Sequence, residues 1–299
     1  MNFPNRWITS SRAIVPSALA LAMALALLTA PGGCTMDSFM FNGSKQDGPY
    51  DFSDSIIPAD KYDADGLFAE AADGTQVNLY FVDSSGDVPN RATTTIFYCH
   101  GNRDHIGHYW DRVELFYEMG YQTLIFDYRG FGRTKGTPTE KGLYMDAEAA
   151  YSYMLTRPDV DPGRVIFYGY SLGCAVCTEM AKRHKTQTAL ILEAPFRSVK
   201  DMVEDGATSS LARSFVTTLK FDNYGKIRDI GSPLFIIHGD SDDYIETQYG
   251  IDLYNHALPP KQLWIVPGGN HTTIPGTEGS QRRQEYMTRV PAYIDQYLP

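Results

Sequence analysis

The sequence predicts an α/β protein built on a doubly wound, mostly parallel sheet of eight strands. From residue 66 onward, short β-rich runs alternate with stretches of helical pattern. Most of these runs are apolar throughout, as strands require when helices cover both faces of a parallel sheet. Residues 60–299 contain no repeat, no change of composition and no Pro/Gly-rich linker, so we expect one domain there.

Eight runs are expected to be strands. The first two alternate in polarity and are joined by Asp73-Gly74, which is typical of an antiparallel hairpin, here at the edge of the sheet. The expected strands are Leu67–Ala72, Val77–Val82, Thr93–Cys99, Thr123–Asp127, Val165–Tyr168, Ala189–Leu192, Leu234–His238 and Leu263–Val266.

Helices are expected between the later strands, where they would form the crossovers of a parallel sheet. They fall at about 104–119, 139–156, 172–184, 246–257 and 281–297. Residues 196–232 hold two weak helical patterns and no strand. We therefore expect this stretch to be a small helical cap inserted over one edge of the sheet.

The first 33 residues have the order of an export signal. Arg6 and Arg12 precede an uncharged stretch from Ala13 to Ala30, and small residues follow before Cys34. This ending resembles the bacterial lipoprotein signal, although Pro31 replaces the usual Leu. The resemblance implies a lipid on Cys34 and a place in the bacterial cell envelope, facing the periplasm or the exterior. Simple secretion after cleavage and an uncleaved membrane anchor are the alternatives.

Residues 34–59 are expected to be a tether, because their first part is rich in Gly, Ser and Asp. The whole chain has 26 Lys and Arg against 36 Asp and Glu, a net charge of -10. None of the basic residues form a run, so the composition argues against binding to nucleic acid.

The four cysteines do not form a disulfide framework, because a lipid on Cys34 would leave only Cys99, Cys174 and Cys177. The spacing Cys174-x-x-Cys177 also occurs in redox and zinc sites, but no second pair exists to complete a structural zinc site. We expect both to be small, buried helix residues.

The motif Gly169-Tyr170-Ser171-Leu172-Gly173 lies where a buried strand must turn into a helix. A nucleophilic serine at such a turn has a strained backbone, and the residues two before and two after it must be small. The start of the following helix offers free N–H groups to a developing anion. We therefore expect Ser171 to be a nucleophile.

A serine hydroxyl needs a base and a carboxylate that orients the base. His271 follows the last predicted strand, whereas His184 and His256 fall on or at the ends of helices. The acid should follow the preceding strand, where three aspartates are available: Asp240, Asp242 and Asp243. The chain order Ser, Asp, His is the one that this architecture uses.

An oxyanion hole is expected where the strand ending at Cys99 runs into His100-Gly101-Asn102. The backbone N–H groups of Asn102 and Leu172 are the expected donors. The alternative is a zinc cluster formed by His100, His105 and His108, but no carboxylate or cysteine stands beside them at ligand spacing.

Residues 60–299 resemble the α/β-hydrolase superfamily. Beyond the serine motif, the similar segments are Asp127-Tyr128-Arg129-Gly130-Phe131-Gly132, the stretch from Gly136 to Ala150, and Glu193-Ala194-Pro195-Phe196. They resemble a branch that contains membrane-associated protein depalmitoylases and many bacterial esterases of unassigned substrate.

The resemblance implies that Asp242 is the triad acid, with Asp243 second and Asp240 third. Glu193 would take that role only in a rearranged site, and Asp127 is interpreted as a turn former. Cys174 and Cys177 depart from the small residues usual in the branch.

The function expected from these residues is cofactor-independent and metal-free hydrolysis of a small acyl ester or thioester. An amidase or peptidase would use the same residues, and a non-catalytic, lipid-handling lipoprotein is an alternative from a different class. Five apolar residues of the insertion would form either a wall for the acyl group or part of the core: Phe196, Phe215, Leu219, Phe221 and Tyr224.

Overall fold

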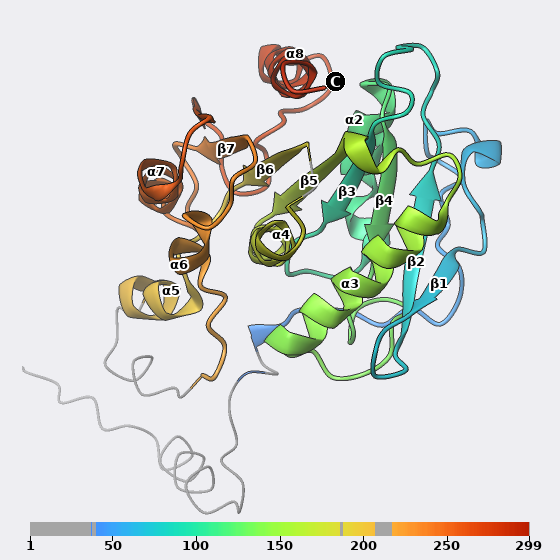
Figure 1. Ribbon diagram of the computed structural model, residues 1–299, viewed down its shortest axis with the longest axis horizontal. Coiled ribbons are helices and arrows are strands. Elements are labelled where there is room, and N and C mark those ends of the chain that lie inside the picture. The colour runs from blue at the N-terminus through green and yellow to red at the C-terminus, as the bar shows by residue number, and fades with distance from the viewer. Residues whose placement is uncertain (1–36, 38–39, 186–187, 207–216, 299) are drawn as a thin grey trace, which may run out of the picture.

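The computed structural model describes residues 37, 40–185, 188–206 and 217–298 (Figure 1). Eight strands form one sheet in the order β1-β2-β4-β3-β5-β6-β7-β8. The strands are β1 Leu67–Glu70, β2 Gln76–Val82, β3 Thr95–Cys99, β4 Gln122–Phe126, β5 Val165–Tyr170, β6 Ala189–Glu193, β7 Leu234–Gly239 and β8 Lys261–Val266. The six strands from β3 to β8 are parallel to one another. Strand β2 pairs antiparallel with both of its neighbours, β1 and β4. The predicted fold class is therefore confirmed.

The hairpin of β1 and β2 differs from the sequence prediction in one respect. Only β1 lies at the edge of the sheet, because β2 pairs with β1 on one side and with β4 on the other. From Val77 to Val82, β2 is buried on both faces, and the half-exposed alternation predicted for it is wrong.

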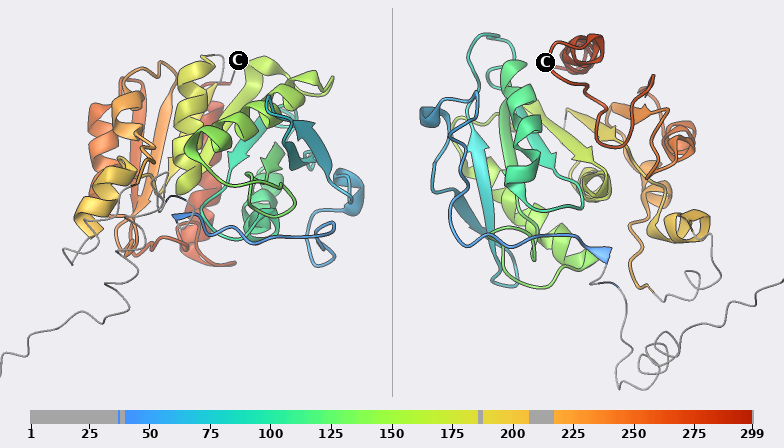
Figure 2. Two further views of the ribbon diagram at one scale, coloured as in Figure 1. Left: turned by 90° about the horizontal axis from the view of Figure 1, so that it is seen from below. Right: turned by 180° about the vertical axis from the view of Figure 1, so that it is seen from behind.

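Helices cover both faces of the sheet. Residues of α3, α4 and α7 pack on one face and residues of α2 and α8 on the other, and Figure 2 shows helices on both sides of the strands. Their bounds are α2 Trp110–Glu118, α3 Glu140–Thr156, α4 Leu172–Arg183, α7 Thr247–His256 and α8 Gln281–Asp295, and the short helix η3 Ile106–Tyr109 precedes α2. Side chains of each strand alternate between the two faces, so Phe97 packs toward α3 and α4 while Tyr98 packs toward α2 and α8.

The segment expected to be a cap insertion, residues 196–232, contains the two predicted short helices, α5 Val199–Gly206 and α6 Asn223–Ile227. Of its five apolar candidates, Phe196, Leu219 and Phe221 are buried, Tyr224 is 40% exposed, and Phe215 lies outside the described residues.

The segment before β1 is packed against the domain from residue 40 onward, in contrast to the predicted flexible tether. Gly43 and Lys45 form backbone bridges with Asp104 and Gly132. Further along, Tyr50 is buried, and Phe52 stacks on Trp110 with 3.6 Å between ring centroids.

Cys34 and the predicted export signal lie outside the described residues. Among the helices of the described ranges, none is both long and apolar enough to span a membrane.

Asp127, which directly follows β4, binds this N-terminal segment to the sheet. Its buried carboxylate accepts hydrogen bonds from the Tyr50 hydroxyl at 2.6 Å, the Ile106 N–H at 2.9 Å and the Arg133 N–H at 3.1 Å. Asp127 therefore organises the turn after β4, as the sequence predicts, and also holds Tyr50.

Stability should depend on pH through Asp127. Burial raises the pKa of Asp127 to about 7, above the value of about 4 in the unfolded chain. A raised folded-state pKa means that the unfolded chain releases this proton first, so stability falls as pH rises from about 4 to about 7. Urea unfolding across this range should show a shallower decline for Asp127→Asn than for the wild type. The exposed Asp47→Asn controls for the loss of one charge, and equal slopes in all three proteins would contradict the prediction.

Candidate active site

Ser171 occupies the sharp turn between β5 and α4. Its φ of 53° and ψ of −116° are a strained conformation for a residue with a side chain. The Ser171 N–H donates to the Glu193 carbonyl at 2.9 Å, which ties the turn to the end of β6. The strain is thus supported by the neighbouring strand.

The two glycines of the motif are required by close backbone packing. A Cβ on Gly173 would lie 1.8 Å from the Cys99 carbonyl oxygen, and one on Gly169 would lie 2.5 Å from the Gly173 carbonyl oxygen. Both glycines therefore allow the start of α4 to approach the ends of β3 and β5, as the sequence interpretation requires.

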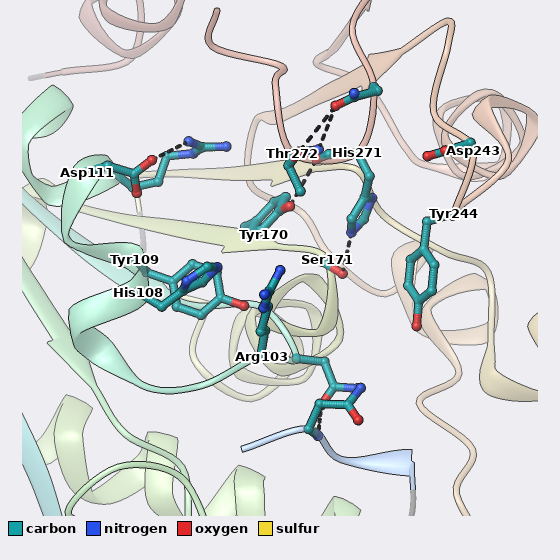
Figure 3. Close-up of a pocket in the computed structure, with 14 residues that line it drawn as sticks. Arg103, His108, Tyr109, Asp111, Tyr170, Ser171, Asp243, Tyr244, His271 and Thr272 are labelled. Atoms are coloured by element: carbon teal, nitrogen blue, oxygen red, sulfur yellow. Dashed lines mark hydrogen bonds and ion pairs between the residues drawn. The ribbon is translucent and has the colours of Figure 1, made fainter. Parts of the chain in front are cut away.

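Ser171, His271 and Asp242 form a hydrogen-bonded chain, and Figure 3 shows the contact between Ser171 and His271. His271 Nε2 is 3.1 Å from Ser171 Oγ, and His271 Nδ1 is 2.9 Å from Asp242 Oδ2. The Asp242 side chain is fully buried and that of His271 is 14% exposed. The loops after β7 and β8 thus bring Asp242 and His271 to Ser171, and these are the three residues selected from the sequence.

Asp242 is held by groups on both carboxylate oxygens. Its Oδ1 accepts the N–H groups of Tyr244 and Ile245 at 3.0 and 2.8 Å, and its Oδ2 lies 3.4 Å from His238 Nε2. Burial alone would raise the pKa of Asp242, but the contacts with His238, His271 and the Ile245 N–H hold it below its ordinary value. Asp242 is therefore ionised at neutral pH and can orient His271.

The other candidate acids have different positions. Asp240 Oδ1 accepts the Gly268 N–H at 2.7 Å and so braces the loop that carries His271. Asp243 is exposed to solvent. Glu193 is fully buried, where it binds Arg112 at 2.8 Å and the hydroxyl groups of Tyr168 and Tyr286. Only Asp242 contacts the histidine.

Tyr170 is a site residue that the sequence analysis missed. Its hydroxyl donates to the His271 carbonyl at 2.9 Å, and its ring lies 5.4 Å from the imidazole between centroids. Tyr244 flanks the imidazole at 5.1 Å, as Figure 3 shows. His238, which supports Asp242, was also missed, although its place near the end of the strand before the acid loop was a usable signal.

Asn102 and Leu172, whose N–H groups are the expected oxyanion donors, line one cavity together with Ser171. Leu172 is the first residue of α4, so its N–H has no acceptor within the helix. Asn102 lies in the loop after β3, whose last carbonyl contacts Gly173. The Asn102 side chain is fixed by the N-terminal segment: its Nδ2 donates to the Met40 carbonyl at 2.7 Å, and its Oδ1 accepts the Asn42 N–H at 3.1 Å.

The histidines of the zinc alternative are used separately. His100 is buried with Nδ1 2.8 Å from the Gly101 carbonyl, and its pKa is lowered by burial to about 3. His105 caps η3, and His108 Nδ1 lies 3.5 Å from Asp104. In the described part of the chain, no group of three or more potential ligands is arranged to hold a metal ion.

Cys174 and Cys177 are buried on α4, as predicted. Cys99 is also buried, and all three thiols are free. Cys174 Sγ donates to the Gly169 and Glu193 carbonyls, both at 3.2 Å, so it takes part in the packing beneath Ser171.

Two cavities meet at Ser171. The larger, of about 810 Å³, is lined mostly by residues of polar or charged type, which include Arg103, His108, Asp111 and Arg112. The smaller, of about 80 Å³, has a mostly apolar lining. A serine polarised by a histidine–aspartate pair beside such cavities can attack a bound carbonyl carbon.

Replacing Gly173 by Ala should destabilise the fold, because the new methyl would overlap the Cys99 carbonyl. We expect a loss of about 3 kcal/mol in the free energy of unfolding, measured by urea denaturation. Gly231→Ala is the matched control, since no atom lies within 4 Å of a Cβ at that position. Equal stability of the two variants would contradict the packing argument.

Comparison with known proteins gives the same fold. The esterase Pf2001 of Pyrococcus furiosus aligns with a TM-score of 0.69 over 87% of this chain and 98% of its own, at 18% identity. Est1E of Butyrivibrio proteoclasticus, solved with ferulic acid bound, aligns with a TM-score of 0.62 over 77% of this chain and 98% of its own, also at 18% identity.

Sequence comparison identifies the family. Residues 90–226 match a hydrolase family model described as serine aminopeptidase, S33. YfhR of Escherichia coli (strain K12) is 31% identical over 73% of this chain and 77% of its own length. The human alpha/beta hydrolase domain-containing protein 17B is 30% identical over 75% of this chain and 73% of its own length. The chain therefore belongs to the α/β-hydrolase superfamily, in the family of these two relatives, as its sequence motifs predict.

Proposed function

We propose that this protein is a serine hydrolase that cleaves carboxylic ester or thioester bonds through an acyl-enzyme intermediate. The observation that carries the proposal is the hydrogen-bonded chain from Ser171 through His271 to the buried, ionised Asp242. Membership of a hydrolase superfamily and the likeness to esterase folds support hydrolysis as the general activity.

In the proposed reaction, Ser171 Oγ attacks the substrate carbonyl carbon while His271 Nε2 accepts its proton. Asp242 stabilises the imidazolium that forms, and the N–H groups of Leu172 and Asn102 bind the oxyanion. Collapse of the intermediate expels the alcohol or thiol, which takes the proton from His271. Water then attacks the acyl-enzyme with His271 again as the base, which releases the acid and restores Ser171.

Several side chains position this machinery without touching the substrate. Tyr170 fixes the backbone of His271, and His238 limits the movement of the Asp242 carboxylate. Asp240 braces the Gly268 end of the same loop. Because three groups hold the loops, the histidine is preorganised for proton transfer.

An amidase or peptidase is the second candidate, favoured by the description of the matching family model. Both candidates share every proposed catalytic residue, so the leaving group must distinguish them. Comparison of butyryl p-nitrophenyl ester with butyryl p-nitroanilide separates the two: the proposal expects at least about a hundredfold higher kcat/KM for the ester. A higher value for the anilide would favour the amidase.

Ser171→Ala should abolish labelling by a fluorophosphonate probe and lower ester kcat at least about a thousandfold. Asp242→Asn should lower kcat by about ten thousandfold, because it favours the wrong histidine tautomer. Asp243→Asn is the control, since this exposed carboxylate does not contact His271.

Labelling that persists in Ser171→Ala would contradict the proposal. A pure protein that turns over no acyl ester or thioester would favour a lipid-handling role.

From the sequence alone, we further propose that Cys34 carries a lipid anchor and that the enzyme faces the outside of the bacterial cytoplasm. In a bacterial host, Cys34→Ser should then move the protein from the membrane fraction to the aqueous fraction. Recovery of both proteins in the same fraction would contradict the anchor.

A further inference from the structure

The small cavity beside Ser171 has walls from two distant parts of the chain. Met40 and Phe41 of the N-terminal segment form one side, and Phe196, Met202 and Phe221 of the cap insertion belong to the other. Leu172 and Ile245 complete the apolar lining next to the reacting groups. Residues that the sequence assigns to a tether are therefore in contact with the candidate active site.

The N-terminal wall is firmly held. Asp104 donates its N–H to the Asn42 carbonyl at 3.0 Å, and Ser44 donates to the Asp104 carbonyl at 3.1 Å. The Phe41 ring packs edge-on against Phe131 and Phe221, with centroids 6.4 and 6.3 Å away. These contacts give the wall a fixed position relative to Ser171.

The same segment also contacts the proposed oxyanion loop. Asn102 has its backbone in that loop and its side chain bonded to Met40 and Asn42. Because these two bonds lie one residue to either side of Phe41, the apolar wall and the Asn102 N–H are fixed together. A displacement of the apolar wall should therefore also displace the Asn102 N–H.

Resting on the proposed function, we infer that Met40 and Phe41 are specificity-determining residues, and that the substrate is a short-chain acyl ester or thioester of a larger, polar alcohol or thiol. The acyl chain lies in the small apolar cavity between the N-terminal segment and the cap insertion. The leaving group occupies the larger cavity, which shares Ser171, Asn102 and Tyr244 with the smaller one.

The size of the apolar cavity sets the expected acyl length. Its volume is about 80 Å³ as bounded by the described residues. A cavity of about 150 Å³ holds one benzene ring. By proportion, this cavity has room for about three or four carbon atoms, and a longer chain would have to displace Phe41 or Met202.

The two cavities also differ in chemistry. The larger is lined by Arg103, Asp111 and Arg112, whose charges favour a polar occupant over a hydrocarbon chain. Its volume of about 810 Å³ is about ten times the 80 Å³ of the apolar cavity. The size and the charged residues of the larger cavity thus assign the polar leaving group to it.

A series of p-nitrophenyl esters from acetate to dodecanoate tests the acyl site. We expect kcat/KM to be highest for butyrate or a shorter chain and at least about tenfold lower for decanoate. Phe41→Ala enlarges the cavity, and should raise the ratio of octanoate to butyrate kcat/KM at least about threefold. Met202→Trp fills the cavity, and should lower the same ratio.

Phe68→Ala is the matched control, because Phe68 is 44% exposed on the edge strand β1 and does not line the cavity. Thermal unfolding of each variant checks that the fold is retained, and the two wall variants change the ratio in opposite directions. A maximum at octanoate or longer, or wall variants that change all chain lengths equally, would overturn the inference.

The outcomes separate the inference from the proposed function. If no ester is hydrolysed and the fluorophosphonate probe does not label Ser171, the proposed function itself fails. If hydrolysis depends on Ser171 but the chain-length profile is unaffected by Phe41 and Met202, only the acyl-site inference fails.

Discussion

The close approach of the start of α4 to the end of β3 is the constraint on which the site depends. Gly173 lies against the Cys99 carbonyl with no space for a Cβ, and this contact fixes where the strained turn at Ser171 can stand. The same contact sets the distance between the Leu172 N–H and the loop that carries Asn102. A positive φ at Ser171 raises the energy of the turn locally, so the surrounding strands must supply the stabilisation.

The sequence was sufficient for the sheet because buried parallel strands have a distinct apolar pattern. All eight strands lie within two residues of the predicted bounds, and Ser171, Asp242 and His271 occupy loops that this topology brings to one edge. Side chains that act across long separations were not predictable in this way. Tyr170 reaches the carbonyl of His271, 101 positions later, only because the carboxyl end of β5 and the loop after β8 meet at the same edge of the sheet.

For the N-terminal segment, the sequence pattern was misleading. Gly, Ser and Asp between residues 42 and 48 are typical of a flexible linker, because composition records only local preferences. The segment is held instead by Asp127, whose burial and three hydrogen bonds depend on tertiary structure. One buried carboxylate thus links the turn after β4, the start of η3 and a segment some eighty residues earlier.

Glu193 holds the strained turn in place, although Glu193 itself has no role in the proton transfer. Its carbonyl accepts both the Ser171 N–H and the Cys174 thiol, while its carboxylate is paired with Arg112 and two tyrosine hydroxyls. An unpaired charge at this depth would cost several kcal/mol. The ion pair therefore keeps the Arg112 side chain next to Glu193. Because Arg112 also lines the polar cavity, the buried pair fixes the wall of the proposed leaving-group site relative to the nucleophile. A carboxylate that sequence resemblance leaves as a minor catalytic candidate is therefore the residue that joins the sheet, the turn and the cavity.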